Sequence, residues 1–336
     1  MLTATDFRQL HDELDAQGAF HAPALRSWTK MFVCNGIAVA ISTWVLFSPS
    51  SWSLLALAPA SLFLGAGVMM GHEGGHHSAC NSRRQNNLMI HLAFGVVAGI
   101  SSIFWKYKHN VLHHRNPNDP SKDRDLLLGP VAVTKEQYDR SPAALQWFQR
   151  HMQHYSVWIL SGFLGPLMRI RSFVAMTEHL RTKGADRVFW SDFSCVSLHY
   201  VLWLVLPSLY VSFLWALLVY FLVFFGVGVM LGIIFLPGHT GMPLVDTATD
   251  QWSQQILTSR SITLSRPVSF FWVGLENQLE HHLFPRLSHT KMRQVKPTVR
   301  RWAESHGFEL DEDDFFPTFA RVVAHLHTAA WTDVPI

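Results

Sequence analysis

Four long apolar runs alternate with polar segments along this chain of 336 residues. The runs cover residues 31–47, 52–71, 193–209 and 211–236. Each is close to the ~20 residues that an α-helix needs to cross a hydrocarbon core of ~30 Å. Short uncharged turns separate the first run from the second and the third from the fourth. The pattern predicts an all-α integral membrane protein with four transmembrane helices in two hairpins.

Two shorter apolar stretches lie between the hairpins, at Leu88–Trp105 and Tyr155–Met168. Polar residues interrupt both stretches, and basic residues flank them on both sides. We predict interfacial or re-entrant helices here. The first stretch is long enough to cross the membrane, so a further span stays open as an alternative. The expected organisation is an N-terminal segment of 1–30, a membrane domain of 31–290 and a C-terminal segment of 291–336.

Basic residues near the ends of the four predicted spans indicate the orientation of the chain. The two tight turns carry none, whereas the opposite ends of the spans carry Arg26, Lys30, Arg83, Arg84, Lys106, Lys108, Arg181, Lys183, Arg187, Arg260 and Arg266. Short loops rich in Lys and Arg remain in the cytoplasm. We therefore expect both termini and the long central segment to face the cytoplasm.

The composition supports a membrane protein and argues against two other classes. Hydrophobic residues make up 49% of the chain and charged residues 15%, whereas about 25% of an ordinary soluble domain is charged. The net charge of +3 and the absence of a long basic run argue against nucleic-acid binding. Cys34, Cys80 and Cys195 form no CxxC pair, so we expect buried small residues rather than a disulfide framework. The N-terminal sequence does not predict a cleaved signal peptide.

Eight histidines fall in three tight clusters, which read HEGGHH, HNVLHH and QLEHH, and a ninth stands alone in FLPGHTG. Imidazole is the commonest metal ligand among side chains, and packing explains such doublets poorly. In the predicted topology all nine lie on the cytoplasmic side, which indicates a one-sided metal site. The candidate ligands are His72, His76, His77, His109, His113, His114, His239, His281 and His282.

The spacing within the first cluster distinguishes its members. His72 and His76 are four residues apart, so their rings project from the same helical face. His77 is rotated by roughly 100° and can join them only where the helix unwinds. Gly74 and Gly75 give that stretch the freedom to do so. Glu73 is expected to accept a proton from a ligating ring, or less readily to bind the metal itself.

The second cluster repeats the four-residue spacing at His109 and His113, with His114 adjacent. A polar loop follows, in which Asn-Pro and Asp-Pro pairs end any helix. Asp123 and Asp125 in this loop are candidate hydrogen-bond partners for ring N–H groups. Ordinary solvation of the loop is the alternative for each carboxylate taken alone.

In the third cluster, Gln278 stands where a histidine would complete another HxxHH pattern. Glutamine is a weak ligand, so we expect Gln278 to orient a water or a neighbouring ring, and Asn277 to have a similar supporting role. His239 ends the most apolar run of the chain. An ionisable group at such a position indicates a function, and ligation is favoured there over a structural role.

The number of imidazoles restricts the kind of metal centre. Eight or nine nitrogen ligands exclude a thiolate site and exceed the four positions of a zinc centre. Two five- or six-coordinate ions would use about this number. Because imidazole suits iron, copper, zinc and nickel alike, the ligand count favours two metals without identifying the element.

The three clusters, in the contexts HEGGHH, WKYKHNVLHH and QLEHHLFP, resemble in order and spacing the histidine boxes of membrane-bound fatty acid desaturases. The resemblance extends over the hydropathy pattern of about residues 31–290. It implies a di-iron centre that uses O2 and two electrons to remove two hydrogens from a fatty acyl chain. It further implies iron ligation by His72, His76, His109, His113, His114, His281 and His282, with His239 as an additional ligand.

Two features of the boxes depart from the commonest pattern. Three residues rather than two separate His109 from its doublet, and Gln278 heads the third box, as in front-end and sphingolipid-type desaturases. Those enzymes often carry a fused cytochrome b5 domain with an HPGG haem motif, which does not occur in this sequence. The resemblance therefore implies a separate ferredoxin or cytochrome b5-like electron donor. We expect it to dock near Arg83, Arg84, Lys106 and Lys108.

Alternative functions remain open at this point. A hydroxylase or acetylenase would use the same di-iron scaffold, and a histidine-rich metal transporter would also bind ions. A transporter is less expected, because it should carry ligands at mid-bilayer, whereas these clusters lie at the ends of the predicted spans. The sequence leaves open whether lipid, CoA or a carrier protein bears the acyl chain.

Overall fold

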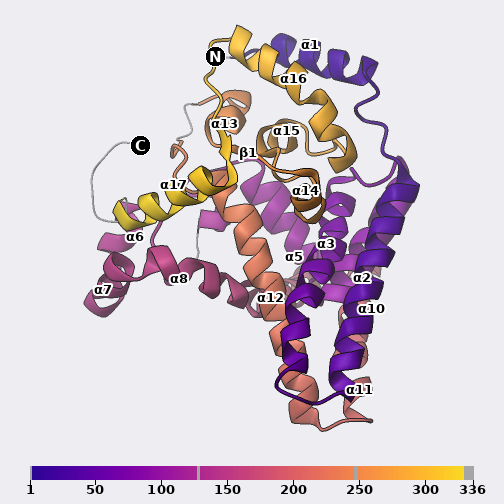
Figure 1. The fold of residues 1–336 in the computed structure, drawn as a ribbon. Helices are drawn as coiled ribbons and strands as arrows, with labels where there is room; N and C mark the ends of the chain where they lie inside the picture. Colours follow the sequence, from indigo (N-terminus) through magenta and orange to yellow (C-terminus); the bar gives the residue numbers. More distant parts are fainter. Residues whose placement is uncertain (1, 127–128, 246–248, 329–336) are drawn as a thin grey trace. The chain divides into compact units, whose positions relative to one another are not determined.

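The computed structural model describes residues 2–126, 129–245 and 249–328. Helices make up nearly all of its regular structure (Figure 1). The strands found in these residues, β1 (Ser261–Thr263) and β2 (Glu312–Asp314), form one parallel pair in which Ser261 lies opposite Glu312. The all-α class predicted from the sequence is confirmed. The last eight residues of the expected C-terminal segment lie outside the described residues.

Among the described residues, five helical segments are long and apolar enough to cross a membrane. They are Ala24–Phe47, Ser53–His76, Gln153–Lys183, Arg187–Ser208 and Phe213–His239. Four of them coincide with the four predicted spans to within a few residues at the ends. The fifth contains the stretch that we expected to be interfacial, so the count of four is not confirmed. The division of the chain at residues 30 and 290 stays a prediction.

The additional segment, Gln153–Lys183, extends beyond the predicted apolar stretch Tyr155–Met168, which is short because Arg169 and Arg171 follow it. The helix continues through both arginines. The buried Arg169 guanidinium lies 4.1 Å from the ring centre of Phe224 and 5.4 Å from that of Tyr220. Cation–π attraction of this kind stabilises a buried cation, which explains how an apolar helix accommodates it.

The predicted re-entrant stretch is a bent pair of helical segments, Arg83–Ala98 and Ser102–His113, whose axes differ by 113°. The bend holds Gly99 at a φ of +68°, a conformation that favours glycine. Beyond it, Asp192 stabilises the start of the second segment, because its carboxylate accepts hydrogen bonds from Ser101 Oγ at 2.5 Å and Ile103 N at 2.8 Å. The segment that carries the second histidine cluster thus begins at a fixed, buried cap.

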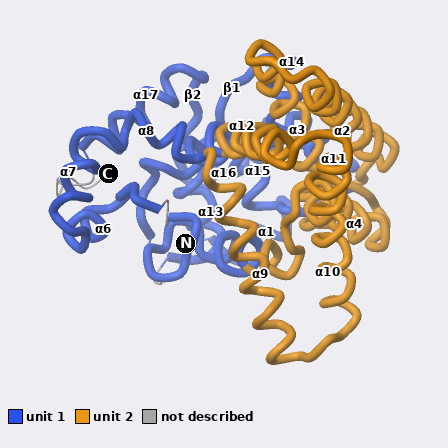
Figure 2. The backbone as a smooth tube through the Cα atoms, turned by 90° about the horizontal axis from the view of Figure 1, so that it is seen from below, with its two compact units in different colours: residues 1–20, 108–161, 232–336 blue, residues 21–107, 162–231 orange. Residues whose placement is uncertain are grey.

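The chain forms two compact units, which Figure 2 shows in different colours. Unit 1 comprises residues 1–20, 108–161 and 232–336, and unit 2 comprises residues 21–107 and 162–231. Helix α12 (Phe213–His239) begins in unit 2 and ends in unit 1. The π-helical segment η3 (Lys106–His113) likewise has nearly all its residues in unit 1.

Unit 1 contains short helices, the two strands and most of the histidine clusters. Its α-helices are α1 (Ala4–Ala16), α6 (Lys135–Asp139), α7 (Ala143–His151), α8 (Gln153–Leu160), α13 (Gln251–Leu257), α14 (Arg266–Trp272), α15 (Gln278–Leu283), α16 (His289–Ser305) and α17 (Phe315–Thr328).

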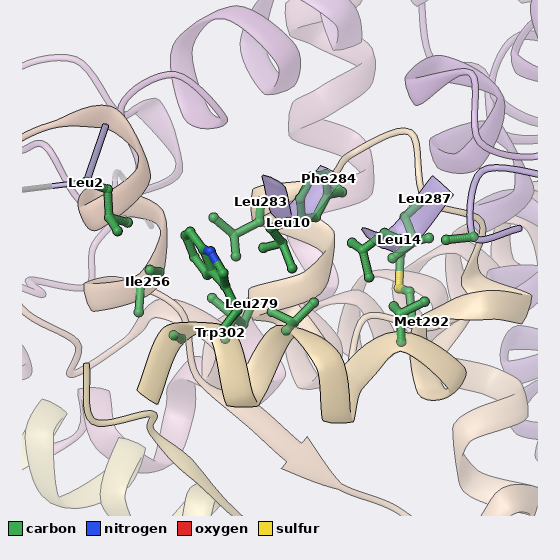
Figure 3. Packing of buried hydrophobic residues seen from close by; sticks show 14 residues of the cluster. Leu2, Leu10, Leu14, Ile256, Leu279, Leu283, Phe284, Leu287, Met292 and Trp302 are labelled. Atoms are coloured by element: carbon green, nitrogen blue, oxygen red, sulfur yellow. The ribbon is translucent and has the colours of Figure 1, made fainter. Parts of the chain in front are cut away.

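The helix that carries the third histidine cluster packs into a compact apolar core (Figure 3). Leu10 and Leu14 of α1 pack there against α15 and α16, together with Met292 and Trp302. The apolar residues of α15, Leu279 and Leu283, belong to the same core. Because α15 is only six residues long, this packing rather than its own helix propensity fixes the histidines that it carries.

Unit 2 consists of longer helices that include the first hairpin. Its α-helices are α2 (Ala24–Phe47), α3 (Leu57–His76), α4 (Arg83–Ile90), α5 (Ser102–Trp105), α9 (Leu164–Lys183), α10 (Arg187–Tyr200) and α11 (Leu206–Ser208), with the first part of α12. Ser61 Oγ in α3 donates to Val223 O in α12 at 2.9 Å. Small residues at such contacts let membrane helices approach closely.

Candidate metal centre

The second histidine cluster lies in η3, which is a π-helix rather than the α-helix that the sequence predicts. His114 N donates to His109 O at 2.9 Å, an i→i+5 hydrogen bond. The wider turn brings His114 as well as His113 close to His109: the Nε2 atoms of His109 and His114 are 3.1 Å apart, and the ring centres of His109 and His113 are 5.2 Å apart. An α-helix would place only one ring of the doublet on this face.

Asp123 fixes the ring of His113. The Asp123 Oδ2 atom accepts from His113 Nδ1 at 3.0 Å and from Asn118 N at 3.0 Å. Burial alone would raise the pKa of this carboxyl, but the nearby His113 and these hydrogen bonds outweigh it and lower the pKa below its usual value. The carboxylate therefore remains an acceptor, which keeps the proton of His113 on Nδ1.

Asp125 lies on the same side of η3. Its Oδ2 is 3.6 Å from His113 Nδ1 and 3.9 Å from His109 Nδ1. Its Oδ1 pairs with the ammonium group of Lys108. The structure thus brings both predicted carboxylates to the second cluster. It also pairs Lys108, one of the four residues of the predicted docking surface, with a site carboxylate.

His239 is the last residue of α12, and its ring points to the third cluster. Its Nδ1 donates to Thr258 O at 2.8 Å. His282 Nδ1 donates to Gln255 Oε1 at 2.8 Å, and the amide of the same Gln255 donates to His114 O at 2.9 Å. Gln278 Nε2 donates to His239 Nε2 at 2.7 Å, so this glutamine orients a neighbouring ring, as the sequence predicts.

Six histidines of unit 1 lie close together, and five of them form two overlapping groups of candidate ligands. His113, His239 and His282 offer nitrogens that lie within 4.8 Å of one another, and so do His114, His281 and His282. All six rings are buried or nearly so, and ring centres within the groups are 4.5–5.5 Å apart. The sixth member, His109, contacts His114.

These donors fit a pair of imidazole-bound cations. Three rings donate their Nδ1 hydrogen to a fixed acceptor, namely Asp123, Thr258 or Gln255. In His113 and His282 the other ring nitrogen, Nε2, is thereby left as an acceptor close to other histidines. In His239, Nε2 accepts the hydrogen bond from Gln278. Burying so many polar rings together without a cation would be unfavourable, and His282 is shared by both groups.

The first histidine cluster lies in unit 2, at the end of α3. His72 and His76 are buried, share one helical face and have ring centres 4.6 Å apart. Both pack edge-to-face on Trp105, at 5.4 and 5.3 Å. Any side chain at Gly75 would collide with this indole, which explains the glycine there. His77 is the left-handed C-cap of the helix, with a φ of 60°. The helix therefore ends at the residue that could join His72 and His76 only if the helix unwound there.

Two residues that the sequence singled out are held by local contacts. Glu73 is buried in α3, and its carbonyl accepts from Ser78 N and Oγ. Asn277 precedes α15 and donates through Nδ2 to Gly274 O at 3.2 Å. Glu280, in the same helix as the third cluster, lines a small polar cavity with Lys296. Burial raises the pKa of Glu280 to about 7.

The sequence did not reveal Gln255, Thr258 and Asn118 as parts of the site. Asn118 has a φ of 56° and donates through Nδ2 to His239 O at 3.1 Å. Its place between two prolines, in NPNDP, was a usable signal, because asparagine tolerates left-handed turns. Gln255 and Thr258 carry no such signal, since their contacts join residues distant in sequence.

Comparison with known proteins identifies the family. The family model for fatty acid desaturases matches residues 42–313. Similar proteins include the Delta(8)-fatty-acid desaturase of Borago officinalis (26% identical), fatty acid desaturase 2-like protein FADS2B of Mus musculus (25%) and Delta(5) fatty acid desaturase fat-4 of Caenorhabditis elegans (28%). The alignments cover 97%, 97% and 91% of this chain, and 75%, 66% and 70% of the respective relatives.

The match covers most of the chain and includes all three histidine clusters. The apolar helices make the chain a multi-pass membrane protein. Together these findings show that the chain belongs to the fatty acid desaturase family, and that it is an oxidoreductase of the membrane-bound kind.

Proposed function

We propose that this chain introduces a double bond into a fatty acyl chain with a di-iron centre, O2 and electrons from a separate donor. The observation that carries the proposal is the pair of overlapping histidine groups in unit 1, which share His282. When bound, two iron ions supply the O2 activation needed to break an unactivated C–H bond. Overall, two hydrogens from the substrate, two electrons and two protons reduce O2 to two waters.

The ligand set is proposed from contacts within unit 1 and from the sequence. His113, His239 and His282 would hold one ion, and His114 and His281 would hold the other with His109. The family resemblance adds His72 and His76 to the set. His77 is the doubtful candidate, because it follows the end of the helix that carries the other two. Gln278 would not replace a histidine, and its amide, which donates to Nε2 of His239, would release that atom when iron binds.

The protein's own task is to keep each imidazole in one tautomer and to exclude water. Asp123, Thr258 and Gln255 accept the Nδ1 hydrogens, so Nε2 is the atom that would bind iron. At His239 the Gln278 amide would have to turn away from Nε2 first. The burial of the rings keeps the centre dry. The named desaturases among the relatives favour desaturation over the hydroxylase or acetylenase alternative. The acyl carrier stays open.

We further propose that Gln153–Lys183 does not cross the membrane. The chain then crosses four times, and the histidine clusters and both termini face the cytoplasm, where a ferredoxin or cytochrome b5-like donor would dock. The support is the distribution of basic residues around the apolar helices. Arg83 and Arg84 are exposed and available for such a contact. Lys108 contributes less, because it pairs with Asp125.

Product analysis tests the reaction. A host that expresses the chain with a compatible reductase should accumulate acyl chains with one additional double bond, detected by mass spectrometry after derivatisation of the alkene. The His282→Ala variant should form none, because it removes the ring shared by both ligand groups. A hydroxylated product without any new double bond would contradict desaturation.

Metal analysis tests the centre. The purified chain should contain about two irons, and His113→Ala or His282→Ala should lose iron because each removes a nitrogen donor. His151→Ala is the matched control, since His151 is exposed and its Nδ1 donates to Trp147 O within its own helix. One weakly held zinc and no iron would favour a transporter or sensor instead.

The Asp123→Asn variant tests how His113 is oriented. An amide no longer guarantees an acceptor for Nδ1, so metal affinity should fall roughly 10–100-fold, the usual effect of losing such a partner. Asp119→Asn is a control in the same loop, because the Asp119 carboxylate binds only Ser121 and Lys122 in the described structure. Equal metal affinity in the two variants would refute the role of Asp123.

Labelling with a membrane-impermeant maleimide tests the orientation. A cysteine introduced by Arg301→Cys, in the exposed part of α16, should react only after intact cells are permeabilised. A cysteine introduced by Ser50→Cys, in the turn after α2, should react in intact cells. The reverse pattern would overturn the proposed orientation.

A further inference from the structure

The last turn of α12 ends at His239, directly after Pro237 and Gly238. The final carbonyl groups of a helix have no partner within the helix and need donors from elsewhere. At the end of α12, the carbonyl groups that need donors lie on both sides of His239, a candidate metal ligand. The residues that donate to these carbonyls therefore decide where the His239 ring sits.

Arg260 donates to three of the four carbonyl groups between Pro237 and Thr240. Its backbone N–H donates to Gly238 O at 2.9 Å, and its Nη1 donates to Pro237 O and Thr240 O, both at 3.1 Å. The remaining carbonyl, that of His239, accepts from Asn118 Nδ2. The side chain of Arg260 is only 2% exposed, so water does not substitute for these contacts.

The segment that carries Arg260 also fixes the ring. Thr258, two residues earlier, accepts the Nδ1 hydrogen of His239 through its carbonyl oxygen. One short stretch of chain therefore holds both the backbone around His239 and the rotation of its imidazole. A shift of Arg260 would displace both together.

Arg260 is itself held by Asp311, whose carboxylate also binds Arg321 in the C-terminal region. Its Nε donates to Asp311 Oδ1 at 3.2 Å, and both oxygens of Asp311 accept from Arg321 in α17, at 2.8 and 2.6 Å. The backbone reinforces the connection, since Ser261 N donates to Asp311 O at 2.9 Å. A buried guanidinium requires such a partner to remain in place.

We infer that Arg260 is a positioning residue for His239: clamped by Asp311, it holds the last turn of α12 so that the imidazole can bind metal. The inference rests on the proposed function, because it assumes that His239 is a ligand. A purely structural role would instead tie the C-terminal region to α12 without affecting the metal, and the experiment below separates the two roles.

The experiment compares Arg260→Gln, Arg260→Lys and Asp311→Asn with His239→Ala as the reference. Iron content and metal affinity are measured, together with the visible spectrum of the Co²⁺-loaded protein, and circular dichroism reports the fold. Arg260→Gln should weaken metal affinity roughly 10–100-fold, as loss of a ligand-orienting partner does. Its Co²⁺ spectrum should change in the same direction as that of His239→Ala. Arg260→Lys keeps the charge but not the paired N–H groups, so it should fall between wild type and Arg260→Gln.

Arg300→Gln is the matched control. Arg300 also forms an ion pair, with Glu312 next to Asp311, but it donates to none of the α12 carbonyls in the described structure. It should leave metal affinity and the Co²⁺ spectrum unchanged. The double variant Arg260→Gln/His239→Ala should bind metal no more weakly than His239→Ala alone, because residues that act through one another are not additive.

The outcomes are distinct. A folded Arg260→Gln with wild-type affinity and spectrum, or a fully additive loss in the double variant, would overturn the inference while leaving the proposed function intact. Unchanged metal binding in His239→Ala would overturn the assignment of His239 and the inference with it. If Arg260→Gln does not fold, the same comparison is made with Arg260→Lys and Asp311→Asn, where wild-type affinity in both would refute the role.

Discussion

An imidazole binds a metal through one nitrogen only when its other nitrogen has a defined partner. The arrangement of unit 1 depends on this constraint. The rings of His113, His239 and His282 donate their Nδ1 hydrogens to acceptors at least ten residues away in sequence. These acceptors are Asp123, Thr258 and Gln255, respectively. The loops and short helices between the apolar helices therefore place a hydrogen-bond acceptor beside each of these imidazole rings.

The acceptors are connected to one another as well as to the rings. Asp123 Oδ2 binds both His113 and Asn118, and Asn118 holds the carbonyl of His239. Gln255 connects the carbonyl of His114 to the ring of His282. A change at one histidine is thus transmitted to a ring from another cluster. Networks of this kind rigidify a site when every member is satisfied.

The sequence indicated which residues belong to the candidate site more fully than it indicated how the backbone positions them. Histidine spacing identified the clusters. Of the two loop carboxylates expected near the second cluster, Asp123 binds the ring of His113, and Asp125 lies 3.6 Å from the same nitrogen. The π-helical turn was not predictable from an HNVLHH pattern, because i→i+4 and i→i+5 hydrogen bonding differ by little in local preference and packing decides between them. Arg260 was counted only as a basic flanking residue, since its contacts with α12 and Asp311 are long-range. The segment 153–183 was underestimated because local hydropathy does not include the aromatic partners of Arg169.

The dependence of His239 on Asp311 and Arg321 has a consequence for biosynthesis. Arg321 follows His239 by 82 positions, which takes on the order of 4–16 s to translate at roughly 5–20 residues per second. During that interval α12 is already made, while the clamp on its last turn does not yet exist. The nascent chain therefore passes through a stage in which its apolar helices have been synthesised, while the contacts of Asp311 and Arg321 that hold Arg260 beside His239 cannot yet form.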